Sequence, residues 1–134
     1  MKIIFVGVHN KPNTPPLHSS TKTGKIVDKI ADAFLNHEIV KTNLFDVDLF
    51  PKSTKERRLL KIDFVNRMGN VSNDIVVLLG AEVHRNTPQN SLGAKKIIKI
   101  AHPASTVYHR SKEQTVEYIQ NAVKQIKEAL WQSQ

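Results

Sequence analysis

The sequence predicts an α/β fold, a three-layer α/β/α sandwich around a four-stranded parallel sheet. Two observations support this: four short segments read as strands, two of them continuous apolar runs, and segments with helical apolar spacing separate them. Continuous apolar runs are typical of parallel strands covered on both faces. Strands that alternate with helices imply right-handed crossovers between parallel neighbours. The 134 residues show no internal repeat and are expected to form one domain, residues 1–134.

The first half of the chain contains two predicted strands and one predicted helix. Residues 3–8 are a continuous apolar run closed by a polar loop, as in a buried strand. The loop of residues 9–23 contains three prolines, and loops of this length in compact domains are often functional. From Lys25 to about His37 the apolar residues recur with helical spacing, which predicts the first helix. Residues 39–44 form the second predicted strand.

A capping box predicts the start of the second helix. Ser53 and Glu56 have the required spacing, and Gly69 is a suitable stop. The third strand, residues 75–80, is the most strongly apolar, and residues 85–96 contain at most a short helix near residues 91–94. The expected apolar face of the second helix is Leu59, Leu60, Ile62, Val65 and Met68.

The fourth strand, residues 97–100, runs into a His-Pro turn. Pro103 disfavours a helical conformation at His102, so the strand is expected to end there. Ser111 and Gln114 predict the start of the last helix. Its expected apolar face is Val116, Ile119, Val123, Ile126 and Leu130, and Trp131 is a candidate to pack back on the sheet.

Composition narrows the classes of function. Twenty lysines and arginines against twelve acidic residues give a formal charge of +8, which favours a polyanionic partner, most simply nucleic acid. The chain has no cysteine, which excludes disulfides and cysteine-ligated clusters and favours a cytoplasmic location. No apolar run approaches 18 residues, so no membrane span is expected. The six histidines lack a metal-binding spacing and no phosphate-loop motif is present, so we expect no metal or cofactor. We also expect a monomer.

The carboxyl ends of parallel strands share one edge of a sheet, where open α/β folds bind their ligands. This edge should gather residues 9–23, Asn43, His84 and His102 around one cleft. Purely structural roles remain open, because His102 could cap its strand and Asn43 could satisfy a backbone group at a strand end. Likewise, serines and threonines in the first loop are more often turn residues than nucleophiles.

Several short motifs, in this order along nearly the whole chain, resemble the uracil-DNA glycosylase superfamily. They are Gly7 closing the first strand, Thr23-Gly24-Lys25, Thr42-Asn43, Leu78-Leu79-Gly80-Ala81 and His102-Pro103-Ala104-Ser105. The likeness is closest to the compact phage and bacterial members and to the branch with an iron–sulfur cluster. The absence of cysteine excludes the cluster. The resemblance implies a four-stranded parallel sheet of strand order 2-1-3-4.

The resemblance also implies roles for individual residues. His102 looks like the histidine that donates to uracil O2 as negative charge develops on the leaving base. Asn43 looks like the asparagine whose amide reads the edge of a flipped base. Gly7 opens the loop that holds the attacking water, where His9 or Asn10 stands at the position of the family's Asp, Asn or Glu.

Other family positions are less well matched. His18 or Ser19 stands near the place of the aromatic that stacks on uracil, and Ala104 replaces the serine of the His-Pro-Ser motif. Residues after that motif fall where the family's loop enters the DNA minor groove. The predicted DNA contacts are Lys22, Lys25, Ser105, Val107, Tyr108, Arg110 and Lys112.

The expected function is hydrolysis of the N-glycosidic bond of uracil or a related modified base in DNA, either single-stranded or duplex with a flipped base. The corresponding processes are base-excision repair and phage DNA metabolism. One alternative is a catalytically weakened module that binds DNA, a nucleotide or a protein partner. Another is an N-glycosidic hydrolase that acts on small nucleotides.

Overall fold

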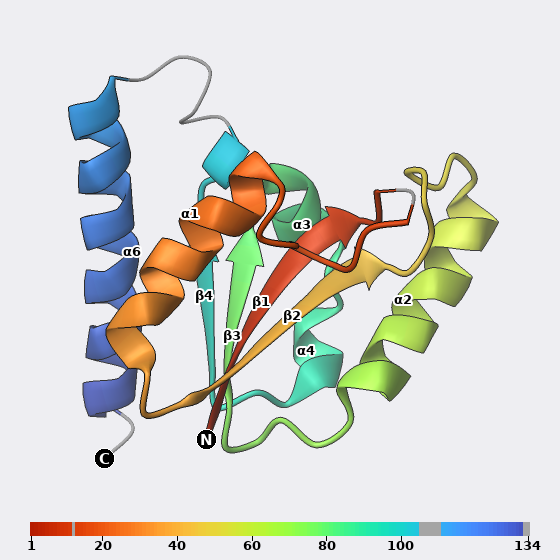
Figure 1. The fold of residues 1–134 in the computed structure, drawn as a ribbon. Helices are drawn as coiled ribbons and strands as arrows, with labels where there is room; N and C mark the ends of the chain where they lie inside the picture. The colour runs from red at the N-terminus through yellow and green to blue at the C-terminus, as the bar shows by residue number, and fades with distance from the viewer. Residues whose placement is uncertain (12, 105–110, 133–134) are drawn as a thin grey trace.

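The chain folds around a four-stranded sheet in which every pairing is parallel (Figure 1). The computed structural model describes residues 1–11, 13–104 and 111–132. The strands are β1 (Lys2–His9), β2 (Glu38–Phe45), β3 (Ile75–Leu79) and β4 (Lys96–Ile100), and their order across the sheet is β2-β1-β3-β4. The predicted α/β class, the four parallel strands and their order are thus confirmed.

Helices cover both faces of the sheet and complete three layers. One face is covered by α1 (Lys22–Ala31), with its 3₁₀ extension η1 (Asp32–Phe34), and by α6 (Lys112–Gln132). The other is covered by α2 (Thr54–Met68), α3 (Ala81–Asn86) and α4 (Gln89–Leu92). Side chains of β1 alternate between the two cores: Ile3 and Phe5 pack with α1 and α6, and Ile4 and Val6 pack with α2 and α3.

The first helix begins and ends earlier than the predicted range of 25–37. Thr21 is the N-cap, and its hydroxyl oxygen accepts a hydrogen bond from the Gly24 N–H at 2.9 Å. The helix therefore starts at Lys22, while η1 ends at Phe34. The loop that precedes it is correspondingly shorter than expected.

Both predicted capping boxes are at helix starts. The Ser53 hydroxyl accepts from the Glu56 N–H at 3.0 Å at the start of α2. At the start of α6, Ser111 Oγ accepts from the Gln114 N–H, and the Gln114 side chain accepts from the Ser111 N–H. These side chains satisfy backbone donors that the first helical turn leaves without a partner.

The predicted apolar faces of these two helices are partly wrong. In α2, Leu59 and Ile62 are 59% and 55% exposed, and Phe64 fills the core instead. In α6 the buried stripe is Tyr118, Ala122, Ile126 and Ala129, while Val116 is exposed. Trp131 is 78% exposed, so it does not pack back on the sheet. Among the residues described, no helix has the length and apolarity needed to cross a membrane.

Candidate functional site

A cavity of about 400 Å³ opens at the carboxyl ends of β1 and β2. Its walls come from distant parts of the chain: the end of β1, the loop before α1, the loop after β2, the start of α3 and the turn after β4. Four of the predicted site residues line it together, namely Gly7, His9, Asn43 and His102. The structure thus brings together residues that are up to 95 positions apart, since 102 − 7 = 95.

Asn43 is the polar residue most deeply set in the cavity wall, with 4% of its surface exposed. It lies beside Gly7 in the β1–β2 register, and its Nδ2 donates to Asn10 Oδ1 at 2.7 Å. A Cβ atom added at Gly7 would lie 2.5 Å from Asn43 Oδ1, closer than real contacts allow. Glycine at position 7 is therefore what lets the Asn43 amide lie against β1.

Arg67 of α2 holds the end of β2 in place. Its guanidinium donates to the carbonyl oxygens of Asn43 and Leu44 at 3.0 and 3.3 Å, and to the Thr42 hydroxyl at 3.1 Å. The same group pairs with Asp63 on its own helix at 2.8 Å. Because the guanidinium fork is rigid, these contacts fix the backbone that carries the Asn43 side chain. No role for Arg67 was predicted from the sequence.

His102 presents a donor nitrogen. Its Nδ1 accepts a hydrogen bond from the Ala104 N–H at 3.0 Å, so in the neutral ring Nε2 carries the proton. Burial, and then the nearby positive charge of Lys11, lowers the pKa of His102 below its usual value and favours that neutral ring. The ring packs closely on Gly80, where an added Cβ would lie 2.9 Å from the His102 Cβ.

His9 has the opposite arrangement. Its Nδ1 lies 3.0 Å from the Asn10 carbonyl oxygen, and a carbonyl can only accept, so Nδ1 is the donor. In the neutral ring Nε2 then carries a lone pair that can accept a proton. Two histidines that line one cavity, His9 and His102, are thus set as a proton acceptor and a proton donor.

Asn10 is not among the described residues that line the cavity. Both ends of its side-chain amide are engaged, because Oδ1 accepts from Asn43 and Nδ2 donates to Asp46 Oδ1 at 2.9 Å. Of the two residues predicted to hold water, His9 is therefore the one at the cavity.

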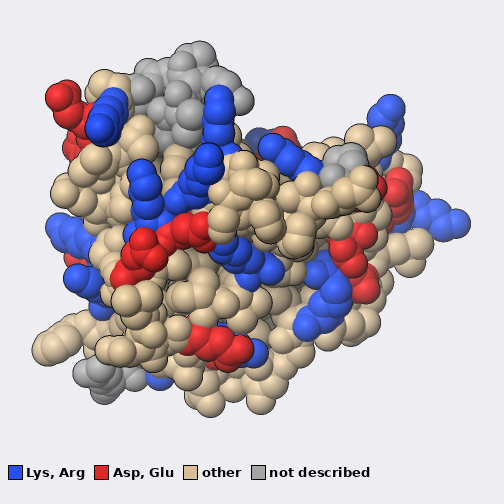
Figure 2. All heavy atoms as spheres, viewed as in Figure 1, with Lys and Arg blue, Asp and Glu red and all other residues tan. Residues whose placement is uncertain are grey.

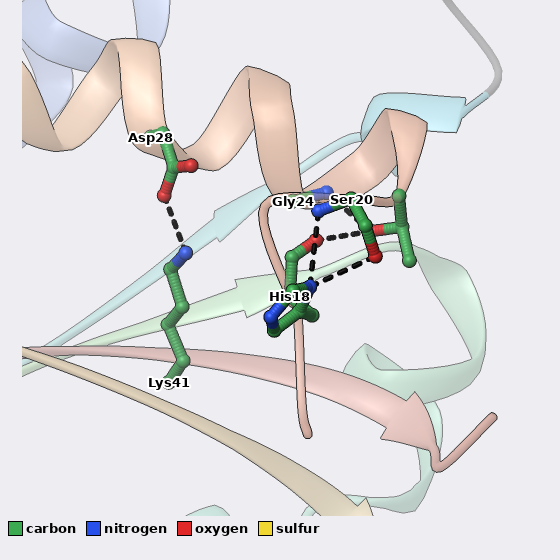
Figure 3. Close-up of polar contacts among 6 residues, drawn as sticks. His18, Ser20, Gly24, Asp28 and Lys41 are labelled. Carbon is green, nitrogen blue, oxygen red and sulfur yellow. Dashed lines mark hydrogen bonds and ion pairs between the residues drawn. The ribbon is translucent and has the colours of Figure 1, made fainter. Parts of the chain in front are cut away.

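His18 and Ser19, predicted as substrate contacts, are exposed and lie outside the cavity lining. Figure 3 shows His18 at the start of α1, where its ring nitrogen Nδ1 meets the Ser20 hydroxyl at 2.8 Å. Its carbonyl accepts from the Thr21 backbone and hydroxyl at 2.9 and 2.7 Å. These contacts shape the loop before α1, so a structural role explains them.

An ion pair between Asp28 of α1 and Lys41 of β2 lies beside this loop (Figure 3). Burial acts to raise the pKa of Asp28, but hydrogen bonds from Lys41 and Ser19 and the charges of Lys41 and His18 outweigh it and lower the pKa. The Asp28 carboxylate therefore stays ionised near neutral pH, and its pairing with Lys41 connects α1 to the edge strand β2.

Apolar walls of the cavity were missed by the sequence analysis. Phe50, in the loop after β2, lines the cavity and packs edge-on against Phe45, with ring centroids 5.4 Å apart. Leu17 lines it from the loop before α1 with φ at +51°, a backbone region that residues other than glycine rarely adopt. The available signal for Phe50 was an aromatic residue in a loop at the ligand-binding edge of the sheet.

Two charged residues also line the cavity, Lys11 and Glu82. Glu82 is hydrogen-bonded to Arg85 and Asn86 on α3, so its carboxylate is engaged. His84 was expected at this cleft, but it lies outside the lining and contacts the Leu78 carbonyl oxygen through Nε2 at 3.0 Å.

No protein-family model matches the chain, and no match was found among curated proteins or solved structures.

Exposed lysines lie at the starts of two helices. Lys22, Lys25 and Lys112, all predicted DNA contacts, are exposed in the first turns of α1 and α6. On the face of the molecule seen in Figure 1, lysine and arginine side chains are spread among fewer acidic ones (Figure 2). The described residues contain no group of three His, Asp or Glu side chains that could hold a metal ion. The predicted contacts Ser105, Val107, Tyr108 and Arg110 lie outside the described residues.

Proposed function

We propose that the cavity receives a uracil-like base flipped out of DNA and that the protein hydrolyses its N-glycosidic bond. The observation that carries the proposal is that one cavity is lined by the Asn43 amide, a donor histidine and an acceptor histidine. Its volume of about 400 Å³ lies in the usual range for small-molecule sites. The sheet order β2-β1-β3-β4 agrees with what the resemblance to uracil-DNA glycosylases implies, which supports placing the fold with that superfamily.

In the proposed reaction, water held by His9 Nε2 attacks C1′ of the deoxyribose. The C1′–N1 bond breaks, and its electron pair leaves with the base, where the negative charge is shared with O2. The Nε2–H of His102 donates to that oxygen, which stabilises the charge as it develops. The proton of the attacking water passes to His9. Asn43 orients the base, and Leu17 and Phe50 provide apolar walls for its faces.

DNA is the proposed carrier of the base because of the charge of the chain. A net charge of +8 and exposed lysines at the starts of α1 and α6 suit a phosphate backbone. Affinity for DNA should then decrease steeply as salt concentration increases, whereas binding of a small nucleotide would depend on salt much less.

Binding without catalysis is the second candidate function. Two observations favour it: the Asn10 amide is occupied by Asn43 and Asp46, and the Glu82 carboxylate is occupied by Arg85. With no free carboxylate among the described cavity residues, activation of water depends on His9 alone. A protein with this geometry and an inactive His9 would bind a base or DNA and release the DNA unchanged.

The test is release of free base from oligonucleotides that contain one uracil, single-stranded or mismatched, followed by cleavage at the abasic site. We expect release by the native protein and a loss of about 100-fold or more in His102→Ala and His9→Gln. His37→Ala is the matched control, because His37 precedes β2 at the opposite end of the sheet. No release together with salt-dependent DNA binding would favour the second candidate function. Neither release nor binding would contradict both.

A further inference from the structure

We propose that Asp46, acting through Asn10, fixes which way the Asn43 amide faces and thereby makes the cavity selective for an imide edge, such as that of uracil, over the amidine edge of cytosine. This inference rests on the proposed function. It assigns roles to two residues that lie outside the cavity lining formed by the described residues. Both are positioning residues, because they would act on the base through Asn43.

The direction of the hydrogen bonds is set at Asp46. An ionised carboxylate can only accept, so the Asn10 group that faces it at 2.9 Å must be the Nδ2 amine. The other end of the same planar amide, Oδ1, then faces Asn43. Since Oδ1 can only accept, Asn43 must turn its Nδ2 toward Asn10, and this contact measures 2.7 Å.

Neither asparagine can reverse alone at low cost. If Asn10 flipped, its oxygen would face the Asp46 carboxylate and its amine would face the amine of Asn43, so both hydrogen bonds would be lost. If only Asn43 flipped, its oxygen would face the oxygen of Asn10. A buried polar group left without its partner costs more than an ordinary hydrogen bond contributes, and Asn43 is 4% exposed.

The backbone on both sides of this chain of contacts is also held. The Asn10 N–H donates to the Val47 carbonyl at 2.8 Å, which connects the first loop to the loop that carries Asp46. Arg67 holds the Asn43 carbonyl at 3.0 Å. Because these backbone contacts do not depend on which way the side-chain amides face, the orientation of the Asn43 amide is decided by Asp46.

The fixed orientation has a chemical consequence at the cavity. Asn43 Oδ1 lies toward Gly7, which also lines the cavity, and no donor among the described residues reaches it. Since no side-chain oxygen of the described residues is sealed from solvent without a partner, Oδ1 is accessible as an acceptor. One hydrogen of Nδ2 is used by Asn10, and the second remains as a donor.

An acceptor beside a donor matches the edge of uracil, which offers its N3–H and its O4 carbonyl. Cytosine offers the reverse, an unprotonated N3 and an exocyclic amine. In this cavity cytosine would place a lone pair against Asn43 Oδ1, and a hydrogen against the remaining N–H. A site built to form such hydrogen bonds rejects the reversed pattern because its own polar groups are then left unpaired.

The experiment measures the dissociation constants of free uracil and free cytosine for the native protein, Asp46→Ala and Asp46→Asn. We expect the native protein to prefer uracil and Asp46→Ala to reduce that ratio by about tenfold, the effect of one net hydrogen bond. The change in Asp46→Asn should be smaller, since its amide oxygen can still accept from Asn10. Asp48→Ala is the matched control, because Asp48 is an exposed aspartate on the same loop.

A ratio of affinities separates positioning from general damage. A variant that is merely less stable would bind both bases more weakly and leave the ratio unchanged. Retained uracil binding with an unchanged ratio in Asp46→Ala would overturn this inference and leave the proposed function intact. Native protein that neither binds uracil nor releases it from DNA would overturn both.

Discussion

Replacing Gly7 by alanine should test the packing that the candidate site depends on. The added Cβ would lie 2.5 Å from Asn43 Oδ1 and 3.1 Å from Leu17 Cδ2. Real Cβ atoms essentially never approach closer than 3.0 Å, so the Asn43 oxygen must move by at least 0.5 Å, which is 3.0 − 2.5 Å. That side chain is buried and hydrogen-bonded to Asn10 at 2.7 Å, so the movement strains or breaks that contact.

Two opposing effects set the size of the change. Loss of a hydrogen bond that leaves a buried group without a partner costs about 1–3 kcal/mol. Replacing glycine by alanine in the interior of a strand otherwise raises the free energy of unfolding by roughly 0.5–1 kcal/mol, because the unfolded chain with alanine has less conformational freedom to lose. The first effect is larger, so Gly7→Ala should lower the free energy of unfolding by about 1 kcal/mol net.

The assay is urea unfolding of four proteins: native, Gly7→Ala, Asn43→Ala and the double variant. With the Asn43 amide removed, the clash is gone, and Gly7→Ala should become neutral or stabilising by up to about 1 kcal/mol. This change of sign is the diagnostic result. Equal destabilisation in both backgrounds would refute the reasoning, because the cost would then arise from Leu17 or from the strand itself.

Two further predictions concern His102 and Arg67. Burial, and then the charge of Lys11, lowers the pKa of His102 below 6.5, so between that lowered value and about 6.5 the unfolded chain binds more protons at this residue than the folded one. The free energy of unfolding should therefore increase with pH across that window and stay level above it, and His102→Gln should remove this slope in urea titrations; a slope of the same size in the variant would contradict the assignment. Arg67→Lys should lower the free energy of unfolding by about 1 kcal/mol and weaken uracil binding, because lysine cannot contact two carbonyl oxygens of β2 with one rigid group. Arg58→Lys on the exposed side of the same helix is the control, and an equal loss in both variants would show that the contacts with β2 contribute nothing.

The two central strands, β1 and β3, were the most predictable, because burial on both faces leaves a continuous apolar run. The third predicted strand, residues 75–80, agrees with the observed Ile75–Leu79 to one residue at its end. Every residue of that strand is buried, so no alternation with polar residues obscured the pattern. The strand order was expected from the resemblance, and the sheet has this order.

The buried faces of α2 and α6 were harder to predict, because each helix has apolar residues on its exposed side as well as on its buried side. In α6 the large residues Val116 and Ile119 suggested one face, but the small residues Ala122 and Ala129 lie against the sheet. Small side chains allow a helix to approach a sheet closely, an effect that hydrophobic periodicity does not weigh. Tyr118, which is not part of the expected face, is buried, and its hydroxyl donates to the Ala101 carbonyl just after β4.

The candidate site, too, was predictable only in part. Asn43 and His102 could be placed at the ligand-binding edge because each stands at the end of a strand. The partnership of Asn10 with Asp46 could not be predicted, since the two residues are 36 positions apart on separate loops. It depends on loop conformation, which no periodic pattern encodes. The role in water activation expected for Asn10 was instead implied by the resemblance to uracil-DNA glycosylases.

The way the cavity is assembled links its occupancy to the stability of the whole domain. Its walls come from the carboxyl end of β1 and from the loops and turns that follow β1, β2, β3 and β4, which meet only when the sheet is paired, so the unfolded chain has no binding site. By mass action, any ligand of the cavity must then shift the folding equilibrium, by about 2.7 kcal/mol at a concentration 100 times its dissociation constant. The melting temperature of this domain is therefore a reporter of occupancy, and a panel of bases and nucleosides can be ranked by it before any catalytic activity is known.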